Sequence, residues 1–269
     1  MALDKDYSYT NAPLNEVIAE IRWKLTPLAT VPGGGIDPYF LKFRDFFSTR
    51  MEKSGYGFKE PVVEPDVPLE LIGGAPAIRF RPGAQQWPLL QVGPGLLTMN
   101  ITPPYEGWKS FRPIVQMGLD RLMEFFGGEG QLFELAQLRL TYIDAFTAKH
   151  GFSGYSDFIR DHFHFLKPSS SKMWEALETS PDAVSIAGEA SVAVKSPEHS
   201  TFVLRARPGT INNTEKAAIV DYGVVRATNL SWPADLMPWF DAAHVACRVA
   251  FENSISDALR DSFGQRVPL

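Results

Sequence analysis

The pattern of apolar and polar positions in the stretch 89–111 predicts two strands joined by a tight turn. LLQVG runs into the turn at Gly93-Pro94-Gly95, and LLTMNI leaves it as the second strand. Pro103-Pro104 ends that strand, because proline lacks a backbone N–H donor. Apolar residues at helical spacing, among them Phe111, then predict a long helix from about Tyr105 or Trp108 to Phe126.

A second pattern, near the N-terminus, predicts a strand followed by a helix. In the segment 16–25, apolar side chains alternate with mainly charged ones, as in a half-buried strand. Asp37-Pro38 is a favourable helix start, because aspartate can cap and proline suits the first helical position. Residues 1–12 are polar, and we expect them to be loosely held. The predicted helix carries an apolar stripe of Phe40, Phe43, Phe47 and Met51.

The remaining elements follow from the same periodicities. Strands are predicted for 69–72, 77–81, 135–146, 183–195, 201–207 and 217–227, the last with Asp221 inside it. Helices are predicted for 155–165, 173–178 and, as one or two segments, 233–263. The segment 59–68 holds three prolines and is predicted to be an extended loop.

Similar short sequences recur in the same order in the two halves of the chain, which predicts an internal duplication. The strongest pair is AIRFRPG at 77–83 and VLRARPG at 203–209. Each half reads as strand, helix, several antiparallel strands and long helix. The predicted fold class is therefore α+β, with a first repeat at 1–130 and a second at 131–269 fused into one globular unit. The halves are expected to form a curved sheet with helices on one face, like the TATA-binding protein or the helix-grip folds.

Composition narrows the class of protein. An apolar content of 45% and a charged content of 21% in 269 residues are ordinary for a globular protein. The single cysteine, Cys247, cannot form an internal disulfide, which favours the cytoplasm. We expect no signal peptide and no membrane association, because no apolar run approaches the ~20 residues of a membrane span. A net charge of −5 argues against a strongly basic nucleic-acid surface, although a local basic patch remains compatible with it.

Several of these motifs together resemble the TIGR04255 family of bacterial proteins over nearly the whole chain. The resemblance rests on PLNEVIAEIRW, LQVGPGLLTMN and LRLTYIDAF, and on His244 with Phe251-Glu252 in the last helix. Members often carry Arg-Tyr-Ile-Asn in the middle strand, where this chain has Thr141-Tyr142-Ile143-Asp144. The resemblance implies no reaction and no catalytic residue. It does imply an accessory role beside a defence, toxin or mobile-element gene.

Arginines are the first candidates for binding chemistry. Residues two apart in a strand point to the same face, so Arg79 and Arg81 share one face, as do Arg205 and Arg207 in the second repeat. With Arg139 they are candidates for binding an anion such as phosphate or carboxylate. The competing interpretation is that these arginines pair with acidic residues such as Glu20, Glu70 or Glu189, or are simply solvated.

The other polar candidates have structural interpretations that we favour. Asp144 and Asp221 lie within apolar strands, where they could form an acid–base pair or a metal site, or each meet an arginine. We favour a structural role, in which each aspartate meets an arginine or caps a strand end. His162 and His164 diverge on a helix, and His244 is expected in a core or an interface. Gly33-Gly34-Gly35 lacks the lysine of a phosphate-binding loop and is predicted to be a flexible loop, and Cys247 is expected to be buried. No zinc-type spacing is present, so we expect no metal and no cofactor.

The leading functional prediction is a non-catalytic bacterial binding protein that holds a protein partner or an anionic ligand on its sheet face or its helices. A protein partner is favoured over nucleic acid at a sequence pI of about 5.6, and homo-oligomerisation is compatible with this prediction. The alternative is an RNA- or nucleotide-binding or processing protein that uses the arginine-bearing face. Arginines locked to acidic neighbours would count against that alternative.

Overall fold

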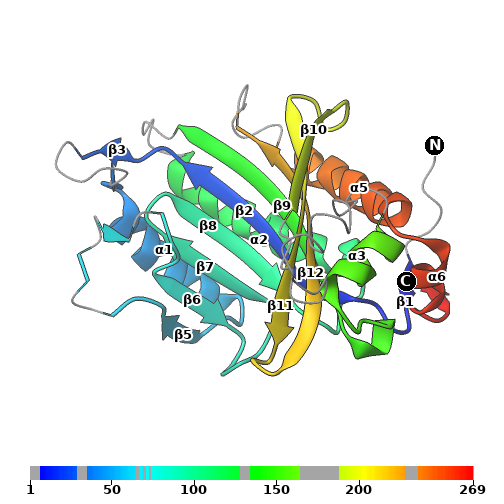
Figure 1. Cartoon of the computed structure of the whole chain (residues 1–269). Coiled ribbons are helices and arrows are strands. Elements are labelled where there is room, and N and C mark those ends of the chain that lie inside the picture. Colours follow the sequence, from blue (N-terminus) through cyan, green and yellow to red (C-terminus); the bar gives the residue numbers. More distant parts are fainter. Residues whose placement is uncertain are drawn as a thin grey trace. The chain divides into compact units, whose positions relative to one another are not determined.

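The computed structural model has an α+β fold built around one large antiparallel sheet. It describes residues 7–28, 35–64, 67–68, 71–72, 74–127, 134–163, 188–227 and 236–268. The sheet has nine strands in the order β10-β11-β12-β9-β2-β8-β7-β6-β5, and two small sheets pair β1 with β13 and β3 with β4 (Figure 1). No described helix is long and apolar enough to cross a membrane.

The strands are β1 Tyr7–Tyr9, β2 Leu14–Trp23, β3 Thr26–Pro27, β4 Gly35–Ile36, β5 Phe58–Pro61, β6 Ile78–Arg81, β7 Leu89–Gly93, β8 Leu96–Ile101, β9 Leu135–Phe146, β10 Gly188–Val194, β11 Ser200–Ile211, β12 Glu215–Arg226 and β13 Arg266–Pro268. The helices are α1 Phe40–Lys53, α2 Trp108–Phe126, α3 Tyr155–His162, α5 Leu236–Ser254 and α6 Asp257–Asp261, with a 3-10 turn at Ala148–His150.

The chain divides into two compact units, and neither is continuous in sequence. Unit 1 comprises residues 1–17, 141–224 and 242–269, and unit 2 comprises residues 18–140 and 225–241. The predicted boundary near residue 130 and the predicted internal duplication stay predictions. The local structure of the matched motifs differs, because β6 ends at Arg81 whereas β11 continues through Pro208-Gly209 to Ile211.

Unit 2 is built on the strand pair that the apolar pattern predicted. β7 and β8 are joined at Gly93-Pro94-Gly95, and every residue in both strands is buried. Helices α1 and α2 pack on β7 and β8 and on each other. Gly118 lets α2 approach closely, since a Cβ there would lie 2.6 Å from Met99 Sδ. The predicted stripe of α1 is confirmed as buried: Phe40, Phe43, Phe47 and Met51.

Asp37 joins three segments of unit 2 instead of capping α1. Its Oδ2 accepts hydrogen bonds from Trp23 Nε1 and from the backbone N–H of Gly95, each at 2.9 Å. Its Oδ1 accepts a bond from the N–H of Tyr39 at 2.9 Å, and Tyr39 is the N-cap residue. Gly95 has φ +68°, a left-handed conformation that favours glycine, so Asp37 stabilises the β7–β8 turn at the point where its backbone is most constrained.

Unit 1 has its own core, which lies between strands and three helices. Strands β9, β11 and β12 pack there against α3, α5 and α6. Side chains alternate across β12, because Val220 and Tyr222 belong to this core while Ala217 and Ile219 belong to a small cluster on the opposite face. The helices that cover the first face contribute Phe158, Ile159 and Leu259, and Ile255 joins this core from the link between α5 and α6.

Three local predictions were wrong, for identifiable reasons. Residues 7–9 are not loosely held, because they form β1, which pairs with β13 near the other end of the sequence. Part of the predicted loop at 59–68 is the edge strand β5, where Pro61 is tolerated because one side of an edge strand needs no donor. Strand β11 does not stop at Pro208. Among the described residues its pairing with β10 extends only as far as Ala206, so Pro208 needs no donor for that pairing.

Two other predicted elements can be compared only in part. Leu71 and Ile72 lie in a turn instead of a strand, while residues 69–70 lie outside the described residues. The predicted helix at 173–178 also lies outside them, as do Glu70, His164 and Gly33-Gly34.

Candidate functional site

The two candidate arginines of β6, in unit 2, share the carboxylate of Glu60. Arg79 donates from Nη1 to Glu60 Oε1 at 3.2 Å, and Arg81 donates from Nε to Glu60 Oε2 at 2.9 Å. Arg79 also donates to Gln91 Oε1 at 2.9 Å. The hydrogen bond from Arg81, with the positive charge of both guanidinium groups, lowers the pKa of Glu60. Arg81 is only 8% exposed, so it is not simply solvated.

The corresponding arginines of β11, in unit 1, are also paired. Arg205 donates from Nε to Glu189 on β10, as the competing interpretation predicted. Arg207 donates from Nη1 to Asp221 Oδ2 at 2.6 Å. Both arginine side chains are nearly half exposed, at 48% and 46%. Exposed ion pairs of this kind contribute little to stability, so they hold the arginines without burying them.

Arg139 on β9 differs from the other four arginines. The residue is half-buried, and its Nε has no hydrogen-bond partner within the described ranges. This Nε–H could donate a hydrogen bond to an anion. Of the five arginines, four therefore already bind carboxylates of this chain.

A group of polar side chains lies between β9 and α5 in unit 1. Asp144 is buried between Tyr142 and Phe146 of the same strand, on the face covered by α5. The Tyr142 hydroxyl and His244 Nδ1 of α5 are 2.7 Å apart and share a hydrogen bond. One turn later, the Cys247 thiol donates to the Tyr222 carbonyl oxygen at 3.5 Å. Sequence reasoning singled out Tyr142, Asp144, His244 and Cys247, but it did not predict that they lie close together.

Burial sets the protonation of this group. It raises the pKa of Asp144 to about 8, with a smaller contribution from the negative charge of Asp221. Burial also raises the pKa of the Cys247 thiol and, well above its usual value, that of the Tyr222 hydroxyl. Near neutral pH the Asp144 carboxyl, the Cys247 thiol and the Tyr222 hydroxyl are therefore mostly uncharged. A protonated thiol is a poor nucleophile, which disfavours cysteine chemistry here.

Asp144 and Asp221 do not form the acid–base pair that was considered. Asp221 lies on the other face of β12, with Ala217 and Ile219, and its Oδ2 is held by Arg207. The prediction that each aspartate meets an arginine holds for Asp221 and is wrong for Asp144. Within the described residues, no group of three or more His, Cys, Asp or Glu side chains is placed to hold a metal ion.

The histidines in the described residues have structural contacts. The His150 ring is buried, and its Nδ1 accepts a bond from the Thr147 N–H at 3.0 Å, which closes a 3-10 turn. His162 Nδ1 lies 3.0 Å from Ser256 Oγ, the N-cap of α6. Burial lowers the pKa of both rings. His199 is exposed, in a turn with positive φ.

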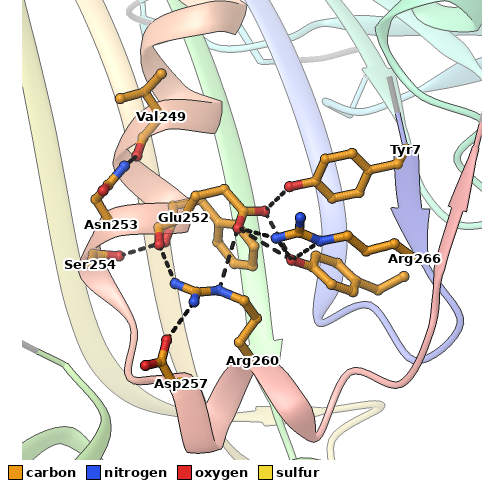
Figure 2. Close-up of polar contacts among 10 residues, drawn as sticks. Tyr7, Val249, Glu252, Asn253, Ser254, Asp257, Arg260 and Arg266 are labelled. Carbon is orange, nitrogen blue, oxygen red and sulfur yellow. Dashed lines mark hydrogen bonds and ion pairs between the residues drawn. The ribbon is translucent and has the colours of Figure 1, made fainter. Parts of the chain in front are cut away.

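Sequence reasoning missed a polar cluster where the two chain ends meet (Figure 2). Glu252 of α5 accepts hydrogen bonds from the Tyr7 hydroxyl at 2.7 Å and from the Tyr9 hydroxyl at 3.1 Å. Arg266 lies 3.3 Å from the same carboxylate, and Arg260 lies 3.4 Å from it. Only 19% of the Glu252 side chain is exposed. The cluster ties β1 and β13 to α5 and α6.

This cluster reverses the usual arrangement of a surface helix. Arg248 of α5 lies over the Tyr7 ring, with its guanidinium 4.5 Å from the centroid. The two charged residues of the segment 242–254 are thus turned toward β1, while Val245 and Val249 are exposed at 41% and 46%. Figure 2 shows Val249 and Asn253 on the side of α5 away from Tyr7 and Arg266. We call Val245, Val249 and Asn253 the outer face of α5.

A shallow apolar groove of about 320 Å³ lies between the end of α5 and the edge strand β10. Its lining includes Ala190 and Val192 of β10, Phe202 and Leu204 of β11, and Ala250 and Asn253 of α5. Asn253 belongs to both surfaces, so the outer face of α5 and the groove are adjacent. Among the described residues that line the groove, none is charged.

Comparisons with models of known families, with curated proteins and with solved structures found no match to this chain. The function therefore has to be argued from the geometry alone.

Proposed function

We propose that this protein is a non-catalytic binding protein whose partner is another protein. The observation that carries the proposal is the outer face of α5, where valines are exposed while the charged residues of the same segment contact β1. Charge on the solvent side and apolar residues toward the core are normal for a surface helix. In the segment 242–254 of α5 the charged side chains contact β1 and the valines are exposed. This pattern is expected of a surface that binds another protein.

The polar groups support binding over catalysis. The Tyr142–His244 pair, the Asp144 carboxyl and the Cys247 thiol lie between β9 and α5, where burial favours the neutral forms of the carboxyl and the thiol. A general acid or base has to reach a substrate, and a nucleophile has to be ionised or activated. These groups are better suited to fixing the position of α5, which carries the proposed contact surface.

The ion pairs of the arginines weigh against the alternative of an RNA- or nucleotide-binding protein. Glu60 holds Arg79 and Arg81, and Glu189 and Asp221 hold Arg205 and Arg207. A phosphate would have to displace a carboxylate from each site, and the displaced carboxylate would repel it. We therefore propose no nucleic-acid function. The accessory role in defence or toxin systems implied by the family resemblance stays a prediction.

The proposal is tested by capturing partners from the native host with tagged wild-type protein and two variants. V245E/V249E places two charges on the outer face of α5, and R205A/R207A is the control on β11. We expect a stoichiometric protein partner with the wild type and with R205A/R207A, and at least tenfold less of it with V245E/V249E. Equal capture by V245E/V249E would contradict the proposal. Circular dichroism and thermal unfolding would establish that both variants fold.

A further inference from the structure

The described residues leave the strand β10 as an unprotected edge of the large sheet. Within the described part of the chain, β11 is the only strand that pairs with β10, in continuous register from Gly188↔Ala206 to Val194↔Ser200. Its five central residues are exposed, Val192 at 59%. Proteins normally protect such edges with lysine, proline, bulges or inward-pointing charges.

The two edges of the sheet differ in this respect. The strand β5, at the other edge, reads FKEP and carries a lysine, a glutamate and a proline. The strand β10 reads GEASVAV, and its one charged side chain, Glu189, is paired with Arg205 of its own chain. The segment from Ala190 to Val194 is uncharged and regular. One edge is therefore protected against strand addition and the other is open to it.

The sequence of β10 is complementary to itself when two copies run antiparallel. With Ser191 opposite the Ser191 of a second copy, Ala190 faces Val192, Glu189 faces Ala193 and Gly188 faces Val194, and each pair then occurs twice. Every valine meets a small residue, and no charge meets a like charge, so cross-strand contacts are favourable throughout. In such a two-fold dimer each β10 edge is paired with the other, so neither remains available for a third copy.

The groove beside β10 fits this arrangement. Ala190 and Val192 lie on one face of β10, next to Leu204 and Phe202 of β11, and all four line the groove. In the pairing above, the Val192 of a second copy would lie beside Ala190, at the rim of the groove. The exposed valine of each copy would thus cover the apolar groove of the other.

We propose that two copies of this chain associate through antiparallel pairing of their β10 strands about Ser191. The contact is one short strand and one groove on each side, which is small for a permanent interface. The dimer should therefore form in a concentration-dependent manner. This association is independent of the partner proposed for the outer face of α5, and V245E/V249E should leave it intact.

The register makes the test specific. Ser191 is exposed, so S191K and S191E should fold normally, but each variant would place like charges opposite one another on the two-fold axis. Sedimentation equilibrium of the full chain, from about 1 to about 200 µM, would measure association. We expect a wild-type dimer, at least tenfold weaker association of S191K or S191E alone, and recovery in an equimolar mixture of the two. A193K is the matched control on the same face of β10, because the introduced ammonium group would oppose Glu189 of the second copy, and this variant should associate at least as strongly as the wild type.

Three outcomes would overturn the proposal. One is a wild-type chain that stays monomeric over the whole range. Another is S191K associating as strongly as the wild type, which would place any dimer elsewhere. The third is a mixture of S191K and S191E that associates no better than either alone, which would exclude the register.

Discussion

Asp144 and Asp221 belong to neighbouring strands but lie on opposite faces of the sheet. Asp144 lies under α5 in an apolar environment, and Asp221 is held by Arg207. In the sequence each of these carboxylates lies within an apolar strand, which invites an acid–base interpretation. The structure separates them by the thickness of the sheet and gives each a different electrostatic environment.

The burial of Asp144 predicts an unusual pH dependence of stability. Its pKa is raised from 3.8 to about 8 in the folded protein, so between these values the folded state binds one more proton than the unfolded state. The contribution is complete below pH 3.8 and declines as the pH rises toward 8, by up to roughly 1.4 kcal/mol per pH unit. Asp144→Asn, which mimics the protonated carboxyl, should remove this decline. It should therefore exceed the wild type in stability by more at pH 8 than at pH 5.

Urea unfolding of both proteins at several pH values measures this effect. Asp257→Asn is the control, because that side chain is 92% exposed and should leave the pH profile as in the wild type. An identical slope in the wild type and in Asp144→Asn would show that Asp144 is ionised in the folded protein.

Glu252 should be a stabilising residue although it lies near the surface. Glu252→Ala removes the acceptor of two tyrosine hydroxyls and one carboxylate partner of two arginines. We expect a loss of about 1–3 kcal/mol in the free energy of unfolding. Glu189→Ala breaks an exposed ion pair with Arg205 and should cost less than about 1 kcal/mol. The free energy of unfolding of both variants is measured by urea unfolding. Equal losses would mean that the cluster around Glu252 stabilises the fold no more than an exposed ion pair does.

Asp37 should be critical to unit 2. Asp37→Ala removes the acceptor of three hydrogen bonds, from Trp23, Tyr39 and Gly95, and leaves the indole N–H of a buried tryptophan without that partner. We expect a loss of about 2–4 kcal/mol, because hydrogen bonds to a charged acceptor are stronger than neutral ones. Asp45→Ala, on the exposed side of α1, is the control and should change the free energy of unfolding by about 0.5 kcal/mol or less. A small effect of Asp37→Ala would show that the β7–β8 turn forms without this residue.

Elements with strong local periodicity were predicted well from the sequence. The strand pair β7–β8, the long strand β9 and the helix α2 have the predicted bounds, because their apolar patterns are unambiguous, and glycine or proline lies at the ends of β7, β8 and α2. Pairings between distant residues were not predicted. Nothing in the sequence around Tyr7 indicates that it pairs with Pro268, since that contact depends on the path of the whole chain.

The same distinction applies to the candidate site. Sequence reasoning identified the candidate arginines and predicted which of them share a sheet face. It also predicted Glu189 as an ion-pair partner. It missed Glu60, which lies in a segment that three prolines caused us to interpret as a loop. It also missed the outer face of α5, because Arg248 and Glu252 would ordinarily be placed in solvent. Only the position of β1 explains why the valines of α5 are exposed instead.

The most direct test of the central claim is to purify the tagged chain from its native host and to analyse what accompanies it. Mass spectrometry would identify bound protein, and the ultraviolet absorption spectrum would reveal bound nucleic acid. The account predicts a stoichiometric protein partner, lost in V245E/V249E, and a spectrum of protein alone. Co-purifying RNA or nucleotide that disappears when Arg79, Arg81, Arg205 and Arg207 are replaced by alanine would contradict it and would support the arginine-bearing surface as the functional one.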